Sequence, residues 1–278
     1  MHDRANRYAL LNQDQPPNNI LSNIAAHASC RSYRSDPLPP GTLEHLITAA
    51  QSASTSSNVQ AYSVIAVEDQ ARKQHLRSLC ADQQMITDCP LFLVFCPDIY
   101  RLRYASARQG YEFGADFLEM FLVASMDAAL AAQNVAVAAE SLGLGICMIG
   151  AVRNKPRDMI DALNLPPGVF ALAGMCLGYP SAELKVKARL PQRTILHREQ
   201  YSDTHLEDGI AEYDRIMAQG PVYRDRQVST ASGVDNSNQY GWAEHTSRRL
   251  AKPDPGDPSP RLREDLRRVL EDHGWSFQ

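Results

Sequence analysis

The sequence predicts a globular fold that contains both helices and strands. The chain has 278 residues, of which 44% are hydrophobic and 22% charged, so it can bury a large core. Short apolar runs typical of buried strands, such as 90–98 (PLFLVFCPD) and 171–180 (ALAGMCLGYP), alternate with segments whose apolar residues recur at helical spacing. This alternation along one chain is the basis of the prediction.

The first hundred residues contain two predicted helices and two predicted strands. Residues 38–54 predict a helix, because prolines precede apolar residues at helical spacing, and the helix runs into small hydroxyl residues. Residues 62–69 predict a strand, residues 70–80 an amphipathic helix, and residues 90–98 a strand that is buried on both faces.

Residues 113–142 predict one long helix. The segment is rich in Ala, Leu and Met, has no glycine after Gly114, and is apolar around most of its circumference. Glu119, Asp127 and Glu140 interrupt it, which argues against a membrane span. A helix of this kind is buried either against its own chain or against a second copy, and its length favours the core of a dimer.

The second half of the chain has fewer regular elements. Residues 143–154 predict a strand that continues into a loop, residues 155–170 a short helix, and residues 171–180 another buried strand. Residues 179–203 are basic and typical of an extended arm. Residues 219–241 are rich in Gly, Ser, Asn and Gln and predict a mobile loop.

A final amphipathic helix is predicted within residues 259–275. Asp257 or Ser259 would cap its start, and Gly274 would end it. At the other end of the chain, residues 1–20 are polar and lack the apolar core of a signal peptide, so we expect a cytoplasmic protein.

Charge, cysteine usage and motifs exclude several classes of protein. With 28 basic and 32 acidic residues and a net charge of −4, the chain lacks the positive charge of a general nucleic-acid binder. Its six cysteines form no C-x-x-C pair, which indicates reduced, buried thiols and no metal site. The glycines at 143–150 follow a helix and precede a strand, the reverse of a dinucleotide-binding fingerprint.

Three polar clusters are candidate parts of one anion-binding site. On an extended backbone, His27, Ser29 and Arg31 would point the same way and could bind a phosphate or the edge of a carbonyl-rich ring. The alternative is a solvated entry to a helix. Cys30 lies close to His27 in the sequence and is a less favoured candidate for a nucleophile.

The other two clusters also have alternative interpretations. The run 54–60 (STSSNVQ) offers uncharged hydrogen-bond donors, but it could simply bond its own backbone. Lys185, Lys187 and Arg189 recur with period two, which suits a phosphate clamp or a surface strand protected by charges.

Four blocks in this order resemble one known family. They are H-x-S-x-R followed by P-L near the N-terminus, S-S-x-x-Q after the first helix, AAQNVAVAAESLGLGICMIGAVRN, and MCLGYPSAELKVKARLP. Together they resemble the oxygen-insensitive NADPH nitroreductases and NADPH-flavin oxidoreductases of the FMN-dependent nitroreductase family. The resemblance covers residues 24–213.

The resemblance implies an α+β fold in which a mixed central sheet is wrapped by helices and two subunits interlock as a homodimer. FMN would lie in each of two pockets at the dimer interface, and the long helix would form the dimer core. The chain would divide into an N-terminal extension, an FMN-binding nitroreductase domain, a mobile loop and a C-terminal helical segment, at 1–20, 21–218, 219–241 and 242–278.

The resemblance also assigns cofactor contacts by position. His27 and Ser29 match contacts to the FMN phosphate or ribityl chain, and Arg31 matches the cation beside N1 and O2 of the flavin ring, where it would stabilise the flavin anion. Lys187 and Arg189 match the phosphate clamp. The further flavin contacts are Thr55, Ser56, Ser57, Gln83, Ile149, Gly150 and Ala151.

Gaps in the resemblance make the residues that contact NADPH or the second substrate harder to assign. The positions that match them are Asn58, Arg224 and Arg263, with Arg261 as the alternative to Arg263. The chain also departs from the family pattern, since Ala28 replaces a residue that is often basic, Ala151 replaces a glycine, and Asn58 replaces a bulky apolar residue.

The implied activity is a ping-pong cycle. NADPH would reduce FMN and leave, and a nitroaromatic, a quinone, a chromate-like oxidant or a free flavin would then take the electrons. Arg224 and Arg226 favour NADPH over NADH, because its extra phosphate needs cations. The alternatives are a flavoenzyme of the same fold with a dedicated substrate, such as a deiodinase-like enzyme or a biosynthetic dehydrogenase, and a non-catalytic FMN-binding regulator.

Overall fold

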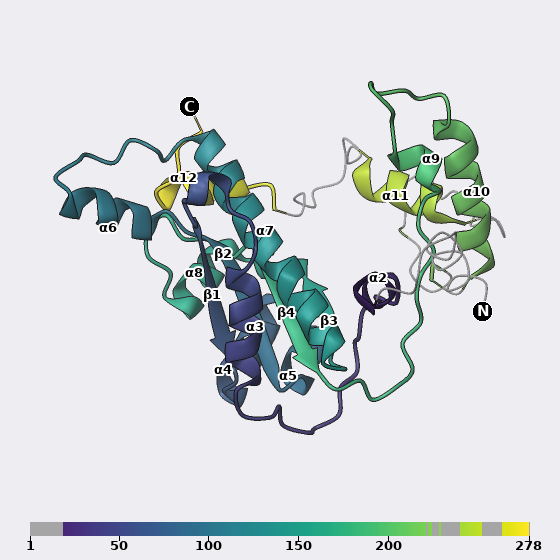
Figure 1. Ribbon diagram of the computed structural model, residues 1–278, viewed down its shortest axis with the longest axis horizontal. Helices are drawn as coiled ribbons and strands as arrows, with labels where there is room; N and C mark the ends of the chain where they lie inside the picture. Colours follow the sequence, from purple (N-terminus) through teal and green to yellow (C-terminus); the bar gives the residue numbers. More distant parts are fainter. Residues whose placement is uncertain (1–18, 221, 224–227, 229–239, 252–262, 278) are drawn as a thin grey trace. The chain divides into compact units, whose positions relative to one another are not determined.

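The computed structural model describes residues 19–220, 222–223, 228, 240–251 and 263–277 (Figure 1). The chain divides into two compact units, and each is described by itself. The larger unit joins His27–Lys185 to Leu262–Gln278, and the smaller joins Met1–Ala26 to Val186–Arg261.

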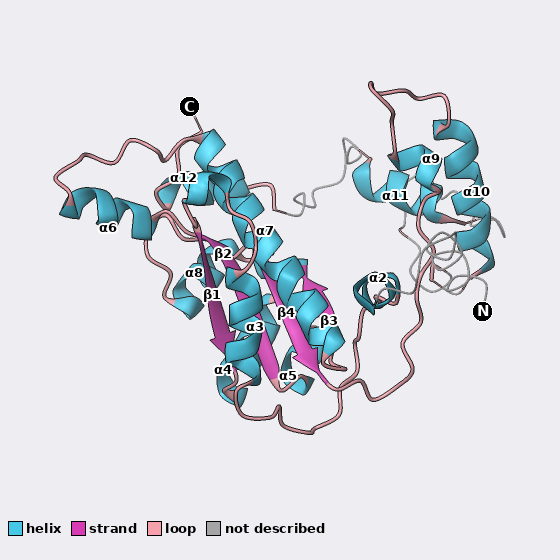
Figure 2. Ribbon diagram, in the orientation of Figure 1, coloured by secondary structure: helices cyan, strands magenta, loops and turns pink. Residues whose placement is uncertain are grey.

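A four-stranded sheet forms the centre of the larger unit (Figure 2). Its order is β1-β2-β4-β3, and the strands are β1 (Tyr62–Val67), β2 (Leu91–Pro97), β3 (Gly145–Ile149) and β4 (Ala173–Gly178). These strands confirm the four that the sequence predicts.

The α+β class is confirmed, but the described strands do not form the expected mixed sheet. The pairings β1–β2, β2–β4 and β3–β4 are all antiparallel. A parallel neighbour would require a connection that crosses back to the starting end of the sheet. The chain between β1 and β2 instead leaves the sheet after Val67 and returns at the same end, because Val67 pairs with Phe92, near the start of β2.

Helices cover both faces of this sheet. On one face α3 (Thr42–Gln51) and α7 (Leu118–Ser141) pack on the sheet, and on the other face α4 (Gln70–Leu79) and α8 (Pro156–Leu163) do so. Alternate residues of β2 enter the two cores, which explains why β2 is apolar throughout. The remaining helical elements of this unit are η1 (Ser56–Asn58), α5 (Met85–Asp88), α6 (Tyr100–Arg108), η2 (Gly150–Arg153) and α12 (Leu266–Asp272).

The long predicted helix is confirmed as α7, which begins at Leu118 rather than at residue 113. Alanines on its inner side, including Ala128 and Ala132, let it pack closely on the sheet. By length and composition α7 could cross a membrane, but the core helix of a soluble protein has the same properties. Its inner side lies in the core of this fold, so we assign it to the core.

The outer side of α7 carries an apolar row. Leu118, Leu122, Met126 and Leu130 recur every four residues and are all exposed. Residues four apart are neighbours on a helix surface, so these side chains form one continuous stripe.

The six cysteines are all buried and none forms a disulfide. This confirms the interpretation of the cysteine pattern as reduced core thiols.

The C-terminal segment of the larger unit packs beside the N-terminal half of α7. Trp275 is buried and stands edge-on to Phe121, with ring centroids 4.9 Å apart. Gly274 follows α12 with φ +89°, so this glycine ends the helix as predicted. The predicted caps Asp257 and Ser259 lie outside the described residues.

The smaller unit contains helices and extended chain in its described residues. Its helices are α2 (Asn19–Ala25), α9 (Gln192–Ile195), α10 (Leu206–Gln219) and α11 (Trp242–Leu250). The sequence predicts an arm and a loop around α10 but misses this helix, whose buried side consists of Gly209, Tyr213 and Met217. Most of the predicted mobile loop lies outside the described residues.

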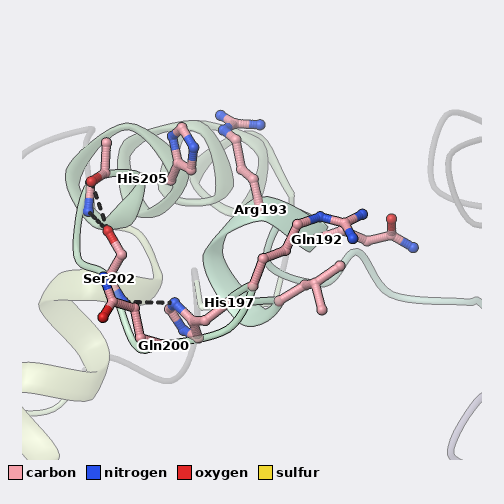
Figure 3. Close-up of a pocket in the computed structure, with 9 residues that line it drawn as sticks. Gln192, Arg193, His197, Gln200, Ser202 and His205 are labelled. Atoms are coloured by element: carbon pink, nitrogen blue, oxygen red, sulfur yellow. Dashed lines mark hydrogen bonds between the residues drawn. The ribbon is translucent and has the colours of Figure 1, made fainter.

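A hollow of about 530 Å³ lies beside α9 and the start of α10 (Figure 3). Arg193, His197, Ser202 and His205 are among its lining residues, and the Ser202 N–H donates to His197 Nδ1 at 3.3 Å. The Arg193 guanidinium pairs with Glu212 at 2.6 Å. No predicted site residue lines this hollow.

Candidate functional site

The H-x-S-x-R segment lies along the edge strand β3. The Cys30 N–H donates to the Ile146 carbonyl at 2.8 Å. Ala28 and Cys30 are buried, whereas Ser29 and Arg31 are exposed. The predicted alternation is therefore confirmed for Ser29 and Arg31, which face away from the core.

Gly145 permits this close approach of the segment to β3. A Cβ at position 145 would lie 2.6 Å from Cys30 Cβ and 2.9 Å from its sulfur. Any side chain there would push the Ser29–Arg31 segment away from the sheet.

His27 is held by a carboxylate that the sequence analysis did not connect with it. Its Nδ1 lies 2.6 Å from Glu140 Oε1, near the end of α7, and the side chains of His27 and Glu140 are 31% and 13% exposed. His27 therefore lies at the start of the exposed row, with its Nδ1 held by Glu140.

The structure does not support Cys30 as a nucleophile. Cys30 is fully buried, its sulfur donates to the Ser32 carbonyl at 3.2 Å, and burial raises the pKa of the thiol. A protonated, buried thiol is unreactive. The Cys30 sulfur thus bonds a backbone carbonyl, which agrees with the interpretation that a nucleophilic Cys30 is the less favoured one.

The hydroxyl run forms a strained polar loop that contains η1. Ser57, Asn58 and Gln60 all have left-handed backbones, with φ of 48°, 57° and 53°. Each such non-glycine residue costs free energy and persists only where the surroundings impose it. Ser56, Ser57 and Asn58 are exposed, and Thr55 is half-buried.

Asp127 of α7 imposes that conformation. Its carboxylate is 1% exposed and accepts the Ser56 N–H and the Ala61 N–H, both at 3.0 Å. The sequence analysis noted Asp127 only as an interruption of an apolar helix. The available signal was a carboxylate on the inner side of such a helix, which requires donors nearby.

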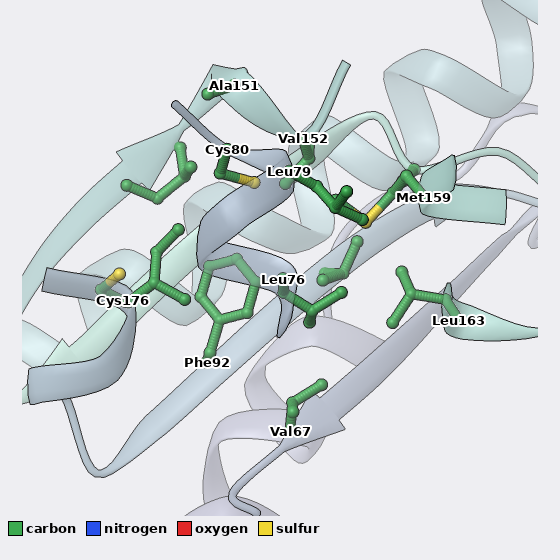
Figure 4. Packing of buried hydrophobic residues seen from close by; sticks show 14 of the residues in the cluster. Val67, Leu76, Leu79, Cys80, Phe92, Ala151, Val152, Met159, Leu163 and Cys176 are labelled. Carbon is green, nitrogen blue, oxygen red and sulfur yellow. The ribbon is translucent and has the colours of Figure 1, made fainter. Parts of the chain in front are cut away.

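Ile149, Gly150 and Ala151, at the end of β3 and just after it, stay predicted flavin contacts. Ile149 and Ala151 are 1% and 8% exposed and belong to the core, where Figure 4 shows Ala151 beside Val152. Their side chains therefore pack inward, and only their backbone could meet a cofactor. Gly150 between them is half-buried and so remains accessible.

Arg263, a predicted substrate residue, lies next to Gly150. It donates to the Gly150 carbonyl at 2.9 Å and to Asn154 Oδ1 at 3.0 Å. Arg153 is close by and donates to the Leu172 carbonyl. Burial, and then the charge of Arg263, lowers the pKa of Arg153. Two guanidinium groups thus lie together at the end of β3.

Gln83 lies in the turn between α4 and α5, where it donates to the Cys80 carbonyl at 3.2 Å. It is half-buried. Its predicted role as a flavin contact stays a prediction.

Apart from Gln83, the predicted residues of the larger unit fall into two groups at opposite edges of the sheet. The hydroxyl loop precedes β1, and Gly150 follows β3, while Ser29 and Arg31 lie along β3. The strand register places the start of β1 and the end of β3 at the same end of the sheet, with β2 and β4 between them.

Lys187 and Arg189 belong to the smaller unit. Lys187 lines a hollow of about 670 Å³ together with aromatic and basic side chains, including Tyr223, Trp242 and Arg249. Lys185 and Arg189 are exposed, and Lys187 is half-buried. Arg224, Arg226 and Arg261 lie outside the described residues.

The described part of the chain contains no group of three or more His, Cys, Asp or Glu side chains that could hold a metal ion. The candidate site consists instead of hydroxyl and cationic groups. It suits an anion and a flat polar ring.

Comparison with known proteins agrees with this geometry. Residues 24–179 match the Nitroreductase family, and residues 187–278 match the Nitroreductase family, C-terminal domain. A Cr(VI) reductase from Pseudomonas sp. (strain G-1) is 41% identical over 191 residues, which are 69% of this chain and 79% of that protein. The NADPH-flavin oxidoreductase of Vibrio harveyi is 34% identical over 234 residues, covering 84% of this chain and 92% of that protein.

A solved structure supports the same assignment. The structure of NfrA2 from B. megaterium superposes with a TM-score of 0.81 at 34% identity, over 94% of this chain and all of that chain. The described fold, the order of the site segments and these matches lead to one conclusion: the chain belongs to the nitroreductase family.

Proposed function

We propose that this protein is an FMN-dependent oxidoreductase that uses NADPH to reduce small molecules such as nitroaromatics, quinones or flavins. The similar proteins named NADPH-flavin oxidoreductase and oxygen-insensitive NADPH nitroreductase support this function. The observation that carries it is the exposed row of Ser29 and Arg31 along β3.

The side chains of this row fit a flavin nucleotide. No carboxylate of the described residues lies within ion-pair distance of Arg31, so its guanidinium can pair with an anionic ligand. In the proposal Ser29 and His27 bind the phosphate or ribityl chain, and Arg31 lies beside N1 and O2 of the flavin ring. The assignment of Lys187 and Arg189, in the smaller unit, to a phosphate clamp comes from the family resemblance alone. The exposed hydroxyls of the loop before β1 donate to other polar atoms of the cofactor.

FMN, when bound, supplies the hydride chemistry between NADPH and the acceptor. The protein's own contribution is electrostatic. The Arg31 cation would favour the negative charge that reduction adds near N1. Gly150 has no side chain, which leaves room for a substrate, and Asn58, Arg224 and Arg263 contact the substrate or NADPH.

The proposed enzyme is a homodimer built on α7. The two groups of site residues in one chain lie at opposite edges of the sheet, so a second copy could complete each site with its own loop. The exposed stripe of Leu118, Leu122, Met126 and Leu130 needs a partner surface, because contiguous apolar surface of this kind is costly in water. An identical stripe on a second copy satisfies that need with two-fold symmetry.

The remaining parts of the proposal concern the chain as a whole. We place the protein in the cytoplasm, because its six cysteines are buried and form no disulfide. The proposed division is an N-terminal extension, an FMN-binding domain, a mobile loop and a C-terminal helical segment, with the boundaries given above.

The test begins with the absorbance spectrum of the purified protein after incubation with FMN, before and after NADPH is added. We expect a bound flavin spectrum that bleaches with NADPH and recovers with a nitrofuran or a quinone. A protein that takes up no FMN would refute the proposal. Negligible turnover with nitrofurans, quinones and free flavins would instead favour a dedicated substrate.

Arg31→Ala tests the observation that carries the proposal. We expect weaker FMN retention and slower reduction by NADPH. Arg34→Ala is the matched control, because Arg34 is also exposed but pairs with Asp36 at 3.3 Å. Unchanged kinetics in Arg31→Ala would remove Arg31 from the site.

A further inference from the structure

We infer that Glu140 is a positioning residue, which fixes the His27 imidazole so that it can bind the phosphate end of the flavin nucleotide. The inference rests on the proposed function for the role of His27. It adds a residue to that site and states what the residue does.

The contact is short and joins distant parts of the chain. His27 Nδ1 and Glu140 Oε1 are 2.6 Å apart, although 113 residues separate them in the sequence. Glu140 is 13% exposed, and His27 is the only Lys, Arg or His of the described residues within ion-pair distance of its carboxylate. The largely buried carboxylate therefore depends on this imidazole.

The position of Glu140 in α7 is unfavourable for the helix itself. Glu140 lies in the last turn, one residue before the helix ends, and that turn contains no basic residue. The negative end of the helix dipole destabilises an acidic side chain there, by typically 0.3–1 kcal/mol. Helix stability thus does not explain a carboxylate at this position, whereas the bond to His27 does.

The bond to Glu140 sets the tautomer and the orientation of the His27 ring. A carboxylate accepts hydrogen bonds, so Nδ1 must carry a proton and the ring plane is set by the line to Glu140. Carboxylates orient metal-binding histidines in the same way, and removing such a partner typically costs 10–100-fold in affinity.

The segment that carries His27 is rigid enough for this orientation to matter. Three residues later the Cys30 N–H is bonded to β3, and Ala139 beside Glu140 is fully buried. Both ends of the contact are therefore anchored to the core. Truncating Glu140 frees the ring without removing the backbone that presents Ser29 and Arg31.

The experiment compares the affinities of FMN and riboflavin, which differ by the phosphate, in variants of the full-length protein. Dissociation constants come from quenching of flavin fluorescence. For Glu140→Ala we expect FMN to bind 10–100-fold more weakly, with riboflavin affinity changed less than about twofold. Glu140→Gln keeps an acceptor oxygen, so it should recover much of the loss. Glu119→Gln is the control, because Glu119 is exposed on the same helix.

Two further measurements separate positioning from a general effect on folding. In a His27→Ala background, Glu140→Ala should have no additional effect on FMN affinity. In ¹⁵N-histidine NMR spectra without flavin, the His27 signal should report a protonated Nδ1 in the unmodified protein and should shift toward the other tautomer in Glu140→Ala. This second measurement requires no cofactor.

The outcomes distinguish the inference from the proposed function. If the unmodified protein binds FMN but Glu140→Ala has the same ratio of FMN to riboflavin affinity, the inference is wrong and the proposed function stands. The inference would also be overturned if His27→Ala and Glu140→Ala lowered FMN affinity additively when combined in one protein. If the unmodified protein takes up no FMN, both are refuted.

Discussion

Asp127 is the residue whose replacement tests most directly how the candidate site is held together. Its carboxylate, 1% exposed, bonds the Ser56 and Ala61 N–H groups at 3.0 Å each and closes the strained loop between them. A hydrogen bond to a charged group contributes about 1.5–3 kcal/mol. Asp127→Asn keeps one acceptor but turns an NH₂ toward the other donor, so we expect a loss of about 2 kcal/mol.

That loss can be converted into a melting temperature. For domains of 150–250 residues, 1 kcal/mol corresponds to about 2–4 °C, so Asp127→Asn should lower Tm by roughly 4–8 °C. Asp127→Ala removes both bonds, about 3–6 kcal/mol if the loop stays in place. We expect a loss near the lower end of this range of free energies, because Ser56 is exposed and its N–H can bond water instead.

Thermal unfolding and amide hydrogen exchange together provide the assay. The Ala61 amide is buried behind the loop, so its exchange should accelerate more than the global loss of stability predicts. FMN retention should also fall, because the hydroxyl groups lose their fixed positions. Glu119→Gln on the same helix is the control. An Asp127→Asn protein with wild-type Tm and wild-type exchange at Ala61 would refute the reasoning.

Four other predictions follow from single features of the structure. Gly145→Ala should cost about 1–3 kcal/mol by overpacking against Cys30 and weaken FMN binding, whereas Gly114→Ala, with nothing within 4 Å, should be neutral in urea denaturation. Met126→Lys should convert dimer to monomer in sedimentation experiments, and a variant that stays dimeric would place the interface elsewhere. Arg263→Ala should raise KM for the acceptor or NADPH, unlike the same change at the exposed Arg267. All six cysteines are buried, and burial also raises the pKa of Cys30, Cys80 and Cys96, so the native protein should react with less than one equivalent of a thiol reagent at pH 8; a fast-reacting thiol would contradict this.

Patterns within short stretches of sequence predicted the strands and the alternation of side chains along extended backbone. The period-two row of Ser29 and Arg31 was predictable because extended backbone alternates its sides, and β3 provides the edge that keeps it extended. The strands were predictable because each is an apolar run between turn residues. The helix α10 was missed because its buried side has only three residues, one of them a glycine.

Contacts between distant segments were not predictable from these patterns. Arg263 reaches Gly150 across 113 residues, and only the family resemblance suggested that it belongs to the site. Ile149 and Ala151 stay predicted flavin contacts, but their side chains fill the core beneath the end of β3, so such a contact would come from their backbone. A family resemblance indicates which sequence positions belong to a site. The direction of each side chain depends on packing, which a motif does not encode.

The two carboxylates on α7 suggest why this helix is apolar nearly all round and yet carries Asp127 and Glu140. Each bonds a different predicted cofactor segment, Asp127 the hydroxyl loop before β1 and Glu140 the His27 end of the row along β3. Thirteen residues separate them, about 20 Å along the axis and roughly 140° around it, which matches segments at opposite edges of one sheet. A helix is stiff, so it sets the spacing of the two segments more strictly than loops could. If the outer stripe of the same helix also joins two copies, α7 determines the distance between site segments both within a subunit and across the dimer. Weakening either carboxylate contact should then affect cofactor binding before it affects the global fold.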